Sequence, residues 1–491
     1  MFPGNSPFRG LGGRYINYKQ MKNKKAFLAL SFIFCILLNT FSQNAEWVSS
    51  TNENRWVKKE SIKLTDFKDT DQVDIEVLTD QKQQTMEGWG GCFNELGWQA
   101  LQTLPFKERD KVIKAFFDPN EGLKYNICRM PIGANDYSFT WYSLNETEGD
   151  FKMKNFSIER DKSILIPYIK SAMKHRPDLK IWASPWSPPT WMKTNKHYAN
   201  KPNTFNDLTE AKSVKSGDQF IQKKEYLAAY ALYLAKFVTA YNNQGVNIHS
   251  VHIQNEPYTY NQWPNCSWTA RGMRDFISMY LGPRFVKNKI PSQIWLSTIN
   301  NANIAVFDSV LSQPNVRKYI SGVGFQYEGK DALVAVAKKY PKLNLMQTET
   351  PCGNGSFDWK SAENTFKEIK LYVDRGVKSY MYWNMILDTT GESSWGWRQN
   401  AQVTIDKMTK KVTYTPEFYI FKHLSYYVVP GSVKLQTKGQ YGNVLSFVTP
   451  EGKIVLVTIN TSNNPISLKI KVGAKMLDVK LPEKSFNTLL M

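Results

Sequence analysis

Two glutamates, each at the end of an apolar, strand-like run, are the residues of this sequence best suited to chemistry. Glu256 follows Asn255 at the end of the alternating run 250–254, and Pro257 behind it cannot donate to a sheet ladder. Glu349 ends a second such run. A carboxylic acid that protonates a leaving oxygen, paired with a carboxylate near an anomeric carbon, is what glycoside hydrolysis uses. Either glutamate alone is equally well explained as an ion-paired or solvated surface group.

Aromatic residues are frequent, with 15 Trp and an aromatic share of 14%. Indole rings stack on the apolar C–H faces of sugars while their N–H groups donate hydrogen bonds. Trp89 and Trp98 are equally well explained by core packing. The tryptophans at or just after predicted strand ends are Trp186, Trp191, Trp383, Trp395 and Trp397.

The elements that must position these side chains alternate between strands and helices. Eight strand-like segments are expected at 85–91, 125–133, 179–186, 248–256, 294–300, 322–327, 343–349 and 379–384. Amphipathic helical segments lie between them at 95–104, 164–175, 224–241, 273–281, 305–311, 332–339 and 362–375.

This alternation predicts parallel βαβ units, and eight of them predict a closed (β/α)8 TIM barrel of the α/β class rather than an open doubly wound sheet. The run Gly88–Gly91 is too compact for a dinucleotide-binding turn. Active sites of such barrels form at the carboxyl ends of the strands. Strands four and seven lie across the barrel mouth, so Glu256 and Glu349 can face each other over a ligand.

The sequence pattern changes after Pro430–Gly431, where helical periodicity gives way to short alternating strands separated by Gly, Asn and Pro. This pattern predicts a small all-β sandwich. A module of this size is small for independent stability, so we expect it to recruit the strand around Val73 and to pack on the barrel. The predicted division is a leader at 1–42, N-terminal strands of the side domain at 43–82, the catalytic barrel at 83–428 and the sandwich at 429–491.

The N-terminal segment is typical of an export signal. Basic residues at 22–25 precede an apolar run at 26–38 and then polar residues up to 43, and Met21 is the expected true start. The apolar run is short for a membrane span. Cys35 lies within this run without a small residue before it, which disfavours a lipid anchor. We therefore expect an exported protein located in the periplasm, at the cell surface or outside the cell.

Charge and ligand-type residues exclude several function classes. The net charge is +20, but the lysines are spread along the chain and form no basic arm. This distribution favours a solvated surface over binding to anionic glycans. No nucleic-acid partner is expected. The 5 His do not cluster and no Cys/His ligand spacing is present. We therefore expect no metal and no cofactor. An oxidising compartment would permit pairing of the four cysteines beyond the leader, which the sequence leaves open.

Several short motifs lie within the predicted barrel. They are Gly88-Trp89-Gly90-Gly91, Tyr125-Asn126-Ile127-Cys128-Arg129, Asn155-Phe156-Ser157, Ser184-Pro185-Trp186-Ser187-Pro188-Pro189, Gln254-Asn255-Glu256-Pro257, Thr348-Glu349 and Tyr382-Trp383-Asn384. With these motifs the chain resembles glycoside hydrolase family 30, the retaining β-glycosidases that include glucocerebrosidases and endo-β-1,6-glucanases. The resemblance runs from Gly88 to the C-terminus, and its most specific part is the Ser-Pro-Trp segment at 183–195.

The resemblance implies a role for each matching residue. Glu256 would be the general acid/base and Glu349 the nucleophile of a double displacement. The resemblance also implies that Asn255 binds the sugar 2-hydroxyl and that Asp136 and Trp186 bind other hydroxyls of the −1 sugar. Trp383 would form the floor of this subsite. Arg129 and Tyr327 would support the nucleophile. The expected substrate is a β-linked glycan or glycoside, and no membrane is required.

Two departures from the family flank the site. Phe325-Gln326-Tyr327 stands where glucocerebrosidase has a His-Trp-Tyr run, and the loop 391–400 aligns with a gap, so that Trp395 and Arg398 become candidate sugar contacts. β-Glucosides, either β-1,6-glucan or a glucosylceramide-like substrate, are the leading expectation. Alternatives are β-xyloside, β-fucoside or β-galactan cleavage, or a non-catalytic carbohydrate-binding protein; a degenerate binder should have lost one glutamate, and both are present. The oligomeric state stays open.

Overall fold

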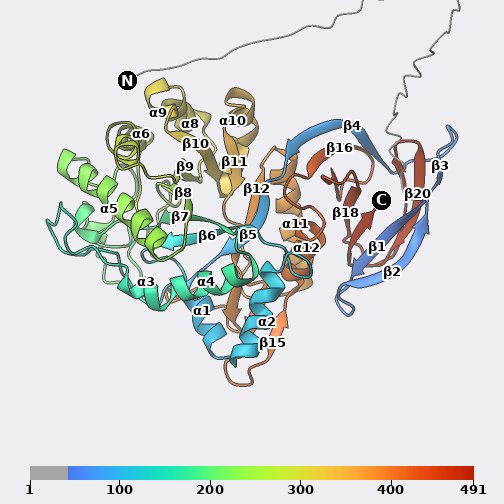
Figure 1. The fold of residues 1–491 in the computed structure, drawn as a ribbon, viewed down its shortest axis with the longest axis horizontal. Helices are drawn as coiled ribbons and strands as arrows, with labels where there is room; N and C mark the ends of the chain where they lie inside the picture. The colour runs from blue at the N-terminus through green and yellow to red at the C-terminus, as the bar shows by residue number, and fades with distance from the viewer. Residues whose placement is uncertain (1–42) are drawn as a thin grey trace, which may run out of the picture. The chain divides into compact units, whose positions relative to one another are not determined.

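The computed structural model describes residues 43–491, and within this range eight parallel strands close into a barrel (Figure 1). Each strand pairs with its neighbours in the chain and the eighth pairs with the first, which removes every sheet edge. This confirms the predicted TIM barrel. The strands are β5 (Gly88–Cys92), β6 (Ile127–Ile132), β7 (Lys180–Pro185), β8 (Ile248–His252), β9 (Gln293–Ile299), β10 (Ile320–Phe325), β11 (Asn344–Gln347) and β12 (Ser379–Asn384).

Helices follow the barrel strands and cover their outer face. In α5 the apolar side chains face the barrel, which explains its high content of good helix formers. The segments predicted from the sequence do not include α2, α3, α7, α9 or α12. The helices are α1 (Glu95–Gln102), α2 (Phe106–Phe117), α3 (Glu159–Ser163), α4 (Leu165–His175), α5 (Lys224–Asn243), α6 (Ala270–Phe276), α7 (Gly282–Lys287), α8 (Ile304–Leu311), α9 (Pro314–Arg317), α10 (Leu333–Lys339), α11 (Trp359–Asp374) and α12 (Pro416–Ser425).

A small apolar cluster contributed only by barrel strands lies beneath the catalytic layer. Its members are Ile127, Trp182, Trp295, Met346 and Met381, all almost fully buried. His252 stacks between two of them, with ring centroids 4.3 Å from Trp182 and 4.9 Å from Trp295. His252 is therefore a core residue.

Short elements shape the loops at the carboxyl ends of the strands. After β12, the strands β13 (Ile386–Asp388), β14 (Val403–Ile405) and β15 (Val412–Tyr414) form a small sheet that frames the segment 391–400. Single turns of 3-10 helix follow β7 at Thr190–Met192 and Glu210–Lys212, and another follows β10 at Tyr327–Asp331. A π-helical turn at Ile277–Leu281 joins α6 to α7.

The all-β domain has its own apolar core and includes strands from both ends of the described chain. Figure 1 shows the N-terminal strands, in blue, beside the C-terminal strands, in red, and β4 pairs with both β16 and β19. The strands are β1 (Asn44–Ser50), β2 (Val57–Lys63), β3 (Thr65–Asp66), β4 (Ile75–Thr85), β16 (Val433–Gly439), β17 (Val444–Val448), β18 (Ile454–Asn460), β19 (Ile466–Val472), β20 (Lys475–Leu481) and β21 (Ser485–Leu490).

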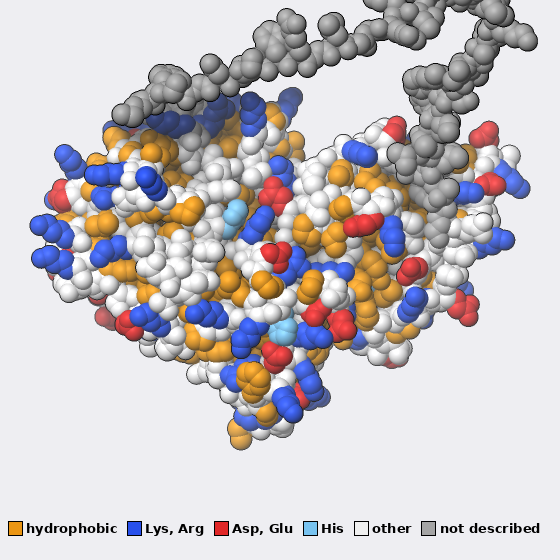
Figure 2. Space-filling view, viewed as in Figure 1, with side chains coloured by type: hydrophobic (Ala, Val, Ile, Leu, Met, Phe, Trp, Pro, Cys, Tyr) orange, Lys and Arg blue, Asp and Glu red, His pale blue; other side chains and the backbone are white. Residues whose placement is uncertain are grey.

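Several expectations concern the surface, the thiols and the leader. On the face shown in Figure 2, Lys and Arg side chains are dispersed among acidic and apolar ones. The cysteines of residues 43–491 are buried free thiols, at positions 92, 128, 266 and 352. Nowhere in residues 43–491 is there a helix with the length and apolar character needed to cross a membrane. The predicted leader and signal peptide, residues 1–42, lie outside the described residues.

Candidate active site

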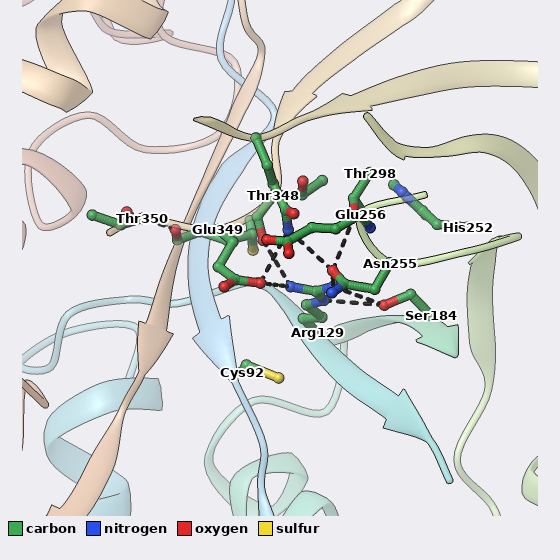
Figure 3. Close-up of polar contacts among 12 residues, drawn as sticks. Cys92, Arg129, Ser184, His252, Asn255, Glu256, Thr298, Thr348, Glu349 and Thr350 are labelled. Carbon is green, nitrogen blue, oxygen red and sulfur yellow. Dashed lines mark hydrogen bonds and ion pairs between the residues drawn. The ribbon is translucent and has the colours of Figure 1, made fainter. Parts of the chain in front are cut away.

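The carboxyl ends of β8 and β11 bring Glu256 and Glu349 into one buried network around Arg129 of β6 (Figure 3). The side chains of Glu256 and Glu349 extend toward the same space in this view. Glu256 is 6% exposed, Glu349 2% and Arg129 0%. Surface ion pairing, the alternative explanation of each glutamate, does not apply to groups buried this deeply.

Glu349 is held by three donors. Arg129 Nη1 lies 2.5 Å from its Oε2, Gln326 Nε2 donates to the same oxygen over 3.0 Å, and the Tyr327 hydroxyl donates to Oε1 over 3.4 Å. Burial raises the pKa of Glu349, and the Arg129 charge and these hydrogen bonds oppose the rise. Charge-assisted contacts of this kind favour the carboxylate form.

Arg129 is itself fixed in a plane by its neighbours. Its Nη2 donates to Asn255 Oδ1 over 2.6 Å and to Ser184 Oγ over 2.9 Å. Its guanidinium carbon lies 4.2 Å from the ring centroid of Trp186 and 5.0 Å from that of Trp182, distances at which a cation is attracted to an aromatic face. The positive charge next to Glu349 is therefore positioned on both sides.

Glu256 has no comparable cation. Its Oε2 accepts a hydrogen bond of 3.1 Å from Thr259 Oγ1, and its backbone N–H donates to Thr298 Oγ1 over 3.1 Å. Burial, together with the negative charge of Glu349, raises the pKa of Glu256 to about 8. Glu256 therefore favours the neutral acid near pH 7, whereas the Arg129 charge and the donors around Glu349 favour its carboxylate form.

The strand before Glu256 is shorter than predicted. β8 ends at His252 instead of Glu256, and pairing resumes only as a single bridge between Asn255 and Thr298. Glu256 has a positive φ of 42°, a strained conformation for a residue with a side chain and incompatible with a strand. This backbone turn aims the carboxyl group into the barrel mouth instead of along the sheet.

The amide oxygen of Asn255 is hydrogen-bonded within the network, whereas its amide nitrogen is not. Its Oδ1 accepts from Arg129 Nη2 and, over 3.1 Å, from Thr298 Oγ1. Among the described residues its Nδ2 has no partner, which leaves two donors for a bound molecule.

Three more predicted residues carry buried polar atoms that the protein leaves unsatisfied. Asp136 Oδ1, Trp186 Nε1 and Trp383 Nε1 accept or donate no hydrogen bond within residues 43–491. Burial and the charges of Glu349 and Glu256 raise the pKa of Asp136 well above its usual range, and the Arg129 charge opposes the rise. The Trp186 and Trp383 rings lie 5.2 Å apart. Buried polar groups without partners are costly, so this cluster is suited to sugar hydroxyls.

The structure places the remaining two predicted contacts farther from the carboxyl groups. Trp395 is buried, stacks on Trp141 at 3.8 Å and donates from Nε1 to the backbone oxygen of Asn135 over 3.1 Å. It thus supports the loop that carries Asp136. Arg398 is exposed, and its side chain makes no contact with the network formed by the described residues.

Sequence reasoning gave no role to four side chains that the structure places in the network. Ser184 and Gln326 were visible as polar residues at predicted strand ends. Thr298 lies near the end of β9, the strand for which no polar end residue was singled out, and Thr259 lies in a loop without any distinguishing motif. Hydroxyl residues are common, so only their contacts reveal them.

A metal site finds no support in side-chain geometry, because residues 43–491 contain no group of three or more His, Cys, Asp or Glu side chains placed to hold an ion. The carboxyl groups described above are instead hydrogen-bonded to Arg, Gln, Tyr and Thr donors.

Comparison with known proteins identifies the fold and the family. Residues 86–428 match the glycosyl hydrolase family 30 TIM-barrel domain, and residues 431–489 match the family 30 beta sandwich domain. A structure of SrfJ from Salmonella typhimurium superposes with a TM-score of 0.81 at 23% identity, covering 91% of this chain and 99% of that one. The endo-beta1,6-glucanase BT3312 gives a TM-score of 0.76 at 21% identity, covering 91% of this chain and 99% of that one.

Relatives with assigned names fall into two groups. Putative glucosylceramidase 1 of Caenorhabditis elegans is 29% identical over 86% of this chain and 82% of its own length. The lysosomal acid glucosylceramidase of Mus musculus is 26% identical over 80% and 78%, and the endo-1,6-beta-D-glucanase neg1 of Aspergillus fumigatus is 23% identical over 82% and 84%. The chain therefore belongs to glycosyl hydrolase family 30 and is a glycoside hydrolase.

Proposed function

We propose that this chain is a retaining β-glycosidase that acts on β-glucosides, either β-1,6-glucan or a glucosylceramide-like substrate. The observation that carries the proposal is the asymmetry of the buried pair. Glu349 is bound by Arg129, whereas the pKa of Glu256 is raised to about 8 in the absence of such a partner. A carboxylate and a neutral acid in one site are what the first step of double displacement needs. The named relatives support β-glucosides as the substrate class.

In this mechanism the Glu349 carboxylate attacks the anomeric carbon and forms a glycosyl ester while the bond to the leaving oxygen breaks. Glu256 transfers its proton to that oxygen. Water then attacks the same carbon, Glu256 takes a proton from it, and the ester bond to Glu349 breaks. The configuration is retained because the carbon is displaced twice.

The surrounding residues would bind the −1 sugar. Asn255 Nδ2 is free to donate to the 2-hydroxyl, which suits a contact that strengthens in the transition state. Asp136 Oδ1, Trp186 Nε1 and Trp383 Nε1 are the buried unsatisfied atoms available to the other hydroxyls, and the Trp383 ring offers a stacking face. Arg129 and Tyr327 would stabilise the nucleophile.

The test is a hydrolysis screen in which the anomeric configuration of the first product is followed by NMR. The substrates expected to be hydrolysed are aryl β-glucosides, β-1,6-glucan and glucosylceramide vesicles. The alternative substrates in the screen are aryl β-xylosides, β-fucosides and β-galactan. We expect a β-configured first product, because a retaining enzyme uses a nucleophile; the retaining mechanism also predicts a carboxyl separation of about 5–5.5 Å. An α-configured product would exclude Glu349 as the nucleophile.

Substitution of the nucleophile provides a second test. Glu349→Gln should reduce kcat by about 10⁴-fold or more while glucoside binding, measured by calorimetry, is kept, because the amide is nearly isosteric but cannot attack. Gln347, buried on the preceding strand, supplies a matched control: Gln347→Glu should leave the chemistry in place if the protein folds. Wild-type turnover by Glu349→Gln would refute the role.

We also propose that the protein is exported, on the basis of the basic, apolar and polar succession of residues 22–43. Fractionation of cells that express the full chain should place the protein outside the cytoplasm, with a new N-terminus near residue 42. An intact chain that is confined to the cytoplasm would contradict this proposal.

A further inference from the structure

A directional chain of hydrogen bonds leads from the end of β9 to the acid/base residue. Asn300 Nδ2 lies 2.5 Å from Thr259 Oγ1, and Thr259 Oγ1 lies 3.1 Å from Glu256 Oε2. The other end of the Asn300 amide, Oδ1, accepts from the backbone N–H of Tyr258 over 3.2 Å. None of these contacts is needed to explain the positions of Glu349 or Arg129.

The donor and acceptor at each step can be assigned without ambiguity. A backbone N–H can only donate, so Tyr258 fixes the Asn300 oxygen toward itself and turns the Asn300 NH₂ group toward Thr259. An NH₂ group can only donate, so the Thr259 oxygen must accept. Its own proton is then directed to Glu256 Oε2.

The backbone of Thr259 is held as firmly as its side chain. Its carbonyl oxygen accepts from Asn200 Nδ2 over 2.8 Å and from Asn265 Nδ2 over 3.2 Å. Its N–H donates to the carbonyl of Glu256 over 3.2 Å. The backbone of Thr259 is therefore fixed, and rotation of its hydroxyl away from the carboxyl group would also break the contact with Asn300.

We propose that Asn300 and Thr259 are positioning residues that keep Oε2 of Glu256 as an acceptor and so place the transferable proton on Oε1. Oε1 then gives its proton to the leaving oxygen in the first step and receives one from water in the second. The inference rests on the proposed function of Glu256.

The electrostatic surroundings give this hydrogen bond a measurable effect. Burial, Glu349 and Glu328 raise the pKa of Glu256, whereas the Thr259 hydrogen bond and the Arg129 charge lower it. Tyr327 and Asp136 also face this space. Loss of the hydroxyl removes a donor to the charged form, and the pKa of Glu256 should then rise further.

Thr259→Val is the first test, because it keeps the shape of the side chain and removes the hydroxyl. The alkaline limb of the kcat/KM profile should move upward by about 1 pH unit. At pH 7, kcat/KM for an alkyl β-glucoside, whose leaving group needs protonation, should fall about 10-fold. The value for 2,4-dinitrophenyl β-glucoside, whose leaving group needs no acid, should be unchanged. Thr259→Ser should restore both properties.

Asn300→Asp is the second test and guards against a folding defect in the first variant. It preserves size and the contact with Tyr258, but the new carboxylate accepts the Thr259 proton and withdraws it from Glu256. The alkaline limb should again move upward, with unchanged far-UV circular dichroism and melting temperature as evidence of folding.

The outcomes separate this inference from the proposed function. A folded Thr259→Val or Asn300→Asp enzyme with the wild-type pH profile and leaving-group dependence would overturn the positioning role. Glu256→Gln should abolish hydrolysis of the alkyl glucoside. If Glu256→Gln leaves that hydrolysis intact, the acid role of Glu256 is wrong, whatever the Thr259 variants do.

Discussion

At the residue scale, Arg129 sets the charge state of Glu349. The guanidinium is completely buried and contacts Glu349, Asn255 and Ser184 with its three nitrogens. Burial alone would favour a neutral Glu349, and the adjacent positive charge is the main opposing effect. The same side chain therefore holds the nucleophile, orients the amide of Asn255 and keeps the two glutamates in different protonation states.

Arg129→Met should therefore raise the pKa of Glu349. A nucleophile must be ionised, so the acid limb of the kcat/KM profile should move to higher pH, and kcat should fall by about 10²–10³-fold at neutral pH. The isolated buried carboxylate should also lower the free energy of unfolding by roughly 3–5 kcal/mol. Steady-state kinetics across pH and denaturant titration measure the two effects.

Arg129→Lys is the matched control, because it keeps the positive charge and removes the planar guanidinium group. It should retain the wild-type position of the acid limb but lose part of kcat, because an ammonium cannot bind Glu349 and Asn255 together. If Arg129→Met keeps the wild-type acid limb, the charge of Arg129 does not control Glu349.

At the element scale, the loops that follow β7 and β8 are tied together by a buried lysine. Lys193 is completely buried, and its Nζ donates to Ser187 Oγ over 3.1 Å, to the backbone oxygen of Tyr198 over 2.6 Å and to that of Asn265 over 2.5 Å. Burial lowers the pKa of Lys193 to about 7. The loop of Glu256 and the Ser-Pro-Trp loop are thus fixed against each other through one amino group.

Lys193→Met should remove the hydrogen bonds that hold these loops together. It should also change how the free energy of unfolding depends on pH. The unfolded lysine titrates near pH 10.5, so the wild-type protein gains stability as pH rises from about 7 toward 10.5 and lacks this gain below pH 7. The variant leaves two carbonyls without their donor and should lose about 1–3 kcal/mol. The difference in melting temperature between wild type and variant should be larger at pH 9.5 than at pH 6.

Lys196→Met supplies the control on the same loop. Lys196 is 62% exposed and pairs with Glu148 at the surface, where solvent screens the pair, so its loss should leave the melting temperature nearly unchanged at either pH. Equal effects of the two substitutions would contradict the locking role of Lys193.

At the scale of the whole molecule, α12 of the barrel is joined to the β-domain through His423. Nδ1 of this residue lies 2.9 Å from Thr488 Oγ1 of β21, and Nε2 lies 2.9 Å from Ser50 Oγ of β1. Thr488 donates its proton to the His423 carbonyl, and Ser50 accepts from the Trp56 N–H. Thr488 therefore accepts from Nδ1–H, and in the neutral imidazole that burial favours, Ser50 donates to Nε2.

Acid should therefore weaken the joint between barrel and β-domain. Burial lowers the pKa of His423 to about 3, below the unfolded value of 6.5, so its stabilising contribution is complete above pH 6.5 and is lost as pH falls toward 3. This loss should reach roughly 2–4 kcal/mol. His423→Asn keeps the donor to Thr488 without a titrating ring, and its unfolding free energy should decline less between pH 6.5 and 4. Parallel slopes for the two proteins would contradict this account.

Some elements of the fold could be predicted from the sequence, and others could not. All eight barrel strands and the helices 95–102 and 224–243 were predictable, because alternating and helical periodicities are local properties of the chain. The helix α2 begins with a mostly charged stretch, Phe106–Arg109, so its buried apolar face is confined to its second half, and α12 has apolar residues on most sides. His423 lies in α12 and is buried because the β-domain covers that side of the helix, a contact that the local sequence does not reveal.

The sequence by itself determined the candidate carboxyl pair, the alternating strands and helices, and the change to an all-β texture. These depend on residue type and on neighbours within a few positions. Only the tertiary structure decided which side chains complete the network. Thr298, Thr259 and Gln326 are ordinary polar residues whose roles arise from contacts with Glu256 or Glu349, and Asn300 acts through its contact with Thr259. It also decided the backbone turn at Glu256, because the bridge between Asn255 and Thr298 joins two different strands. Burial and long-range pairing create the unequal pKa values of the two glutamates, and neither property is encoded in a local pattern.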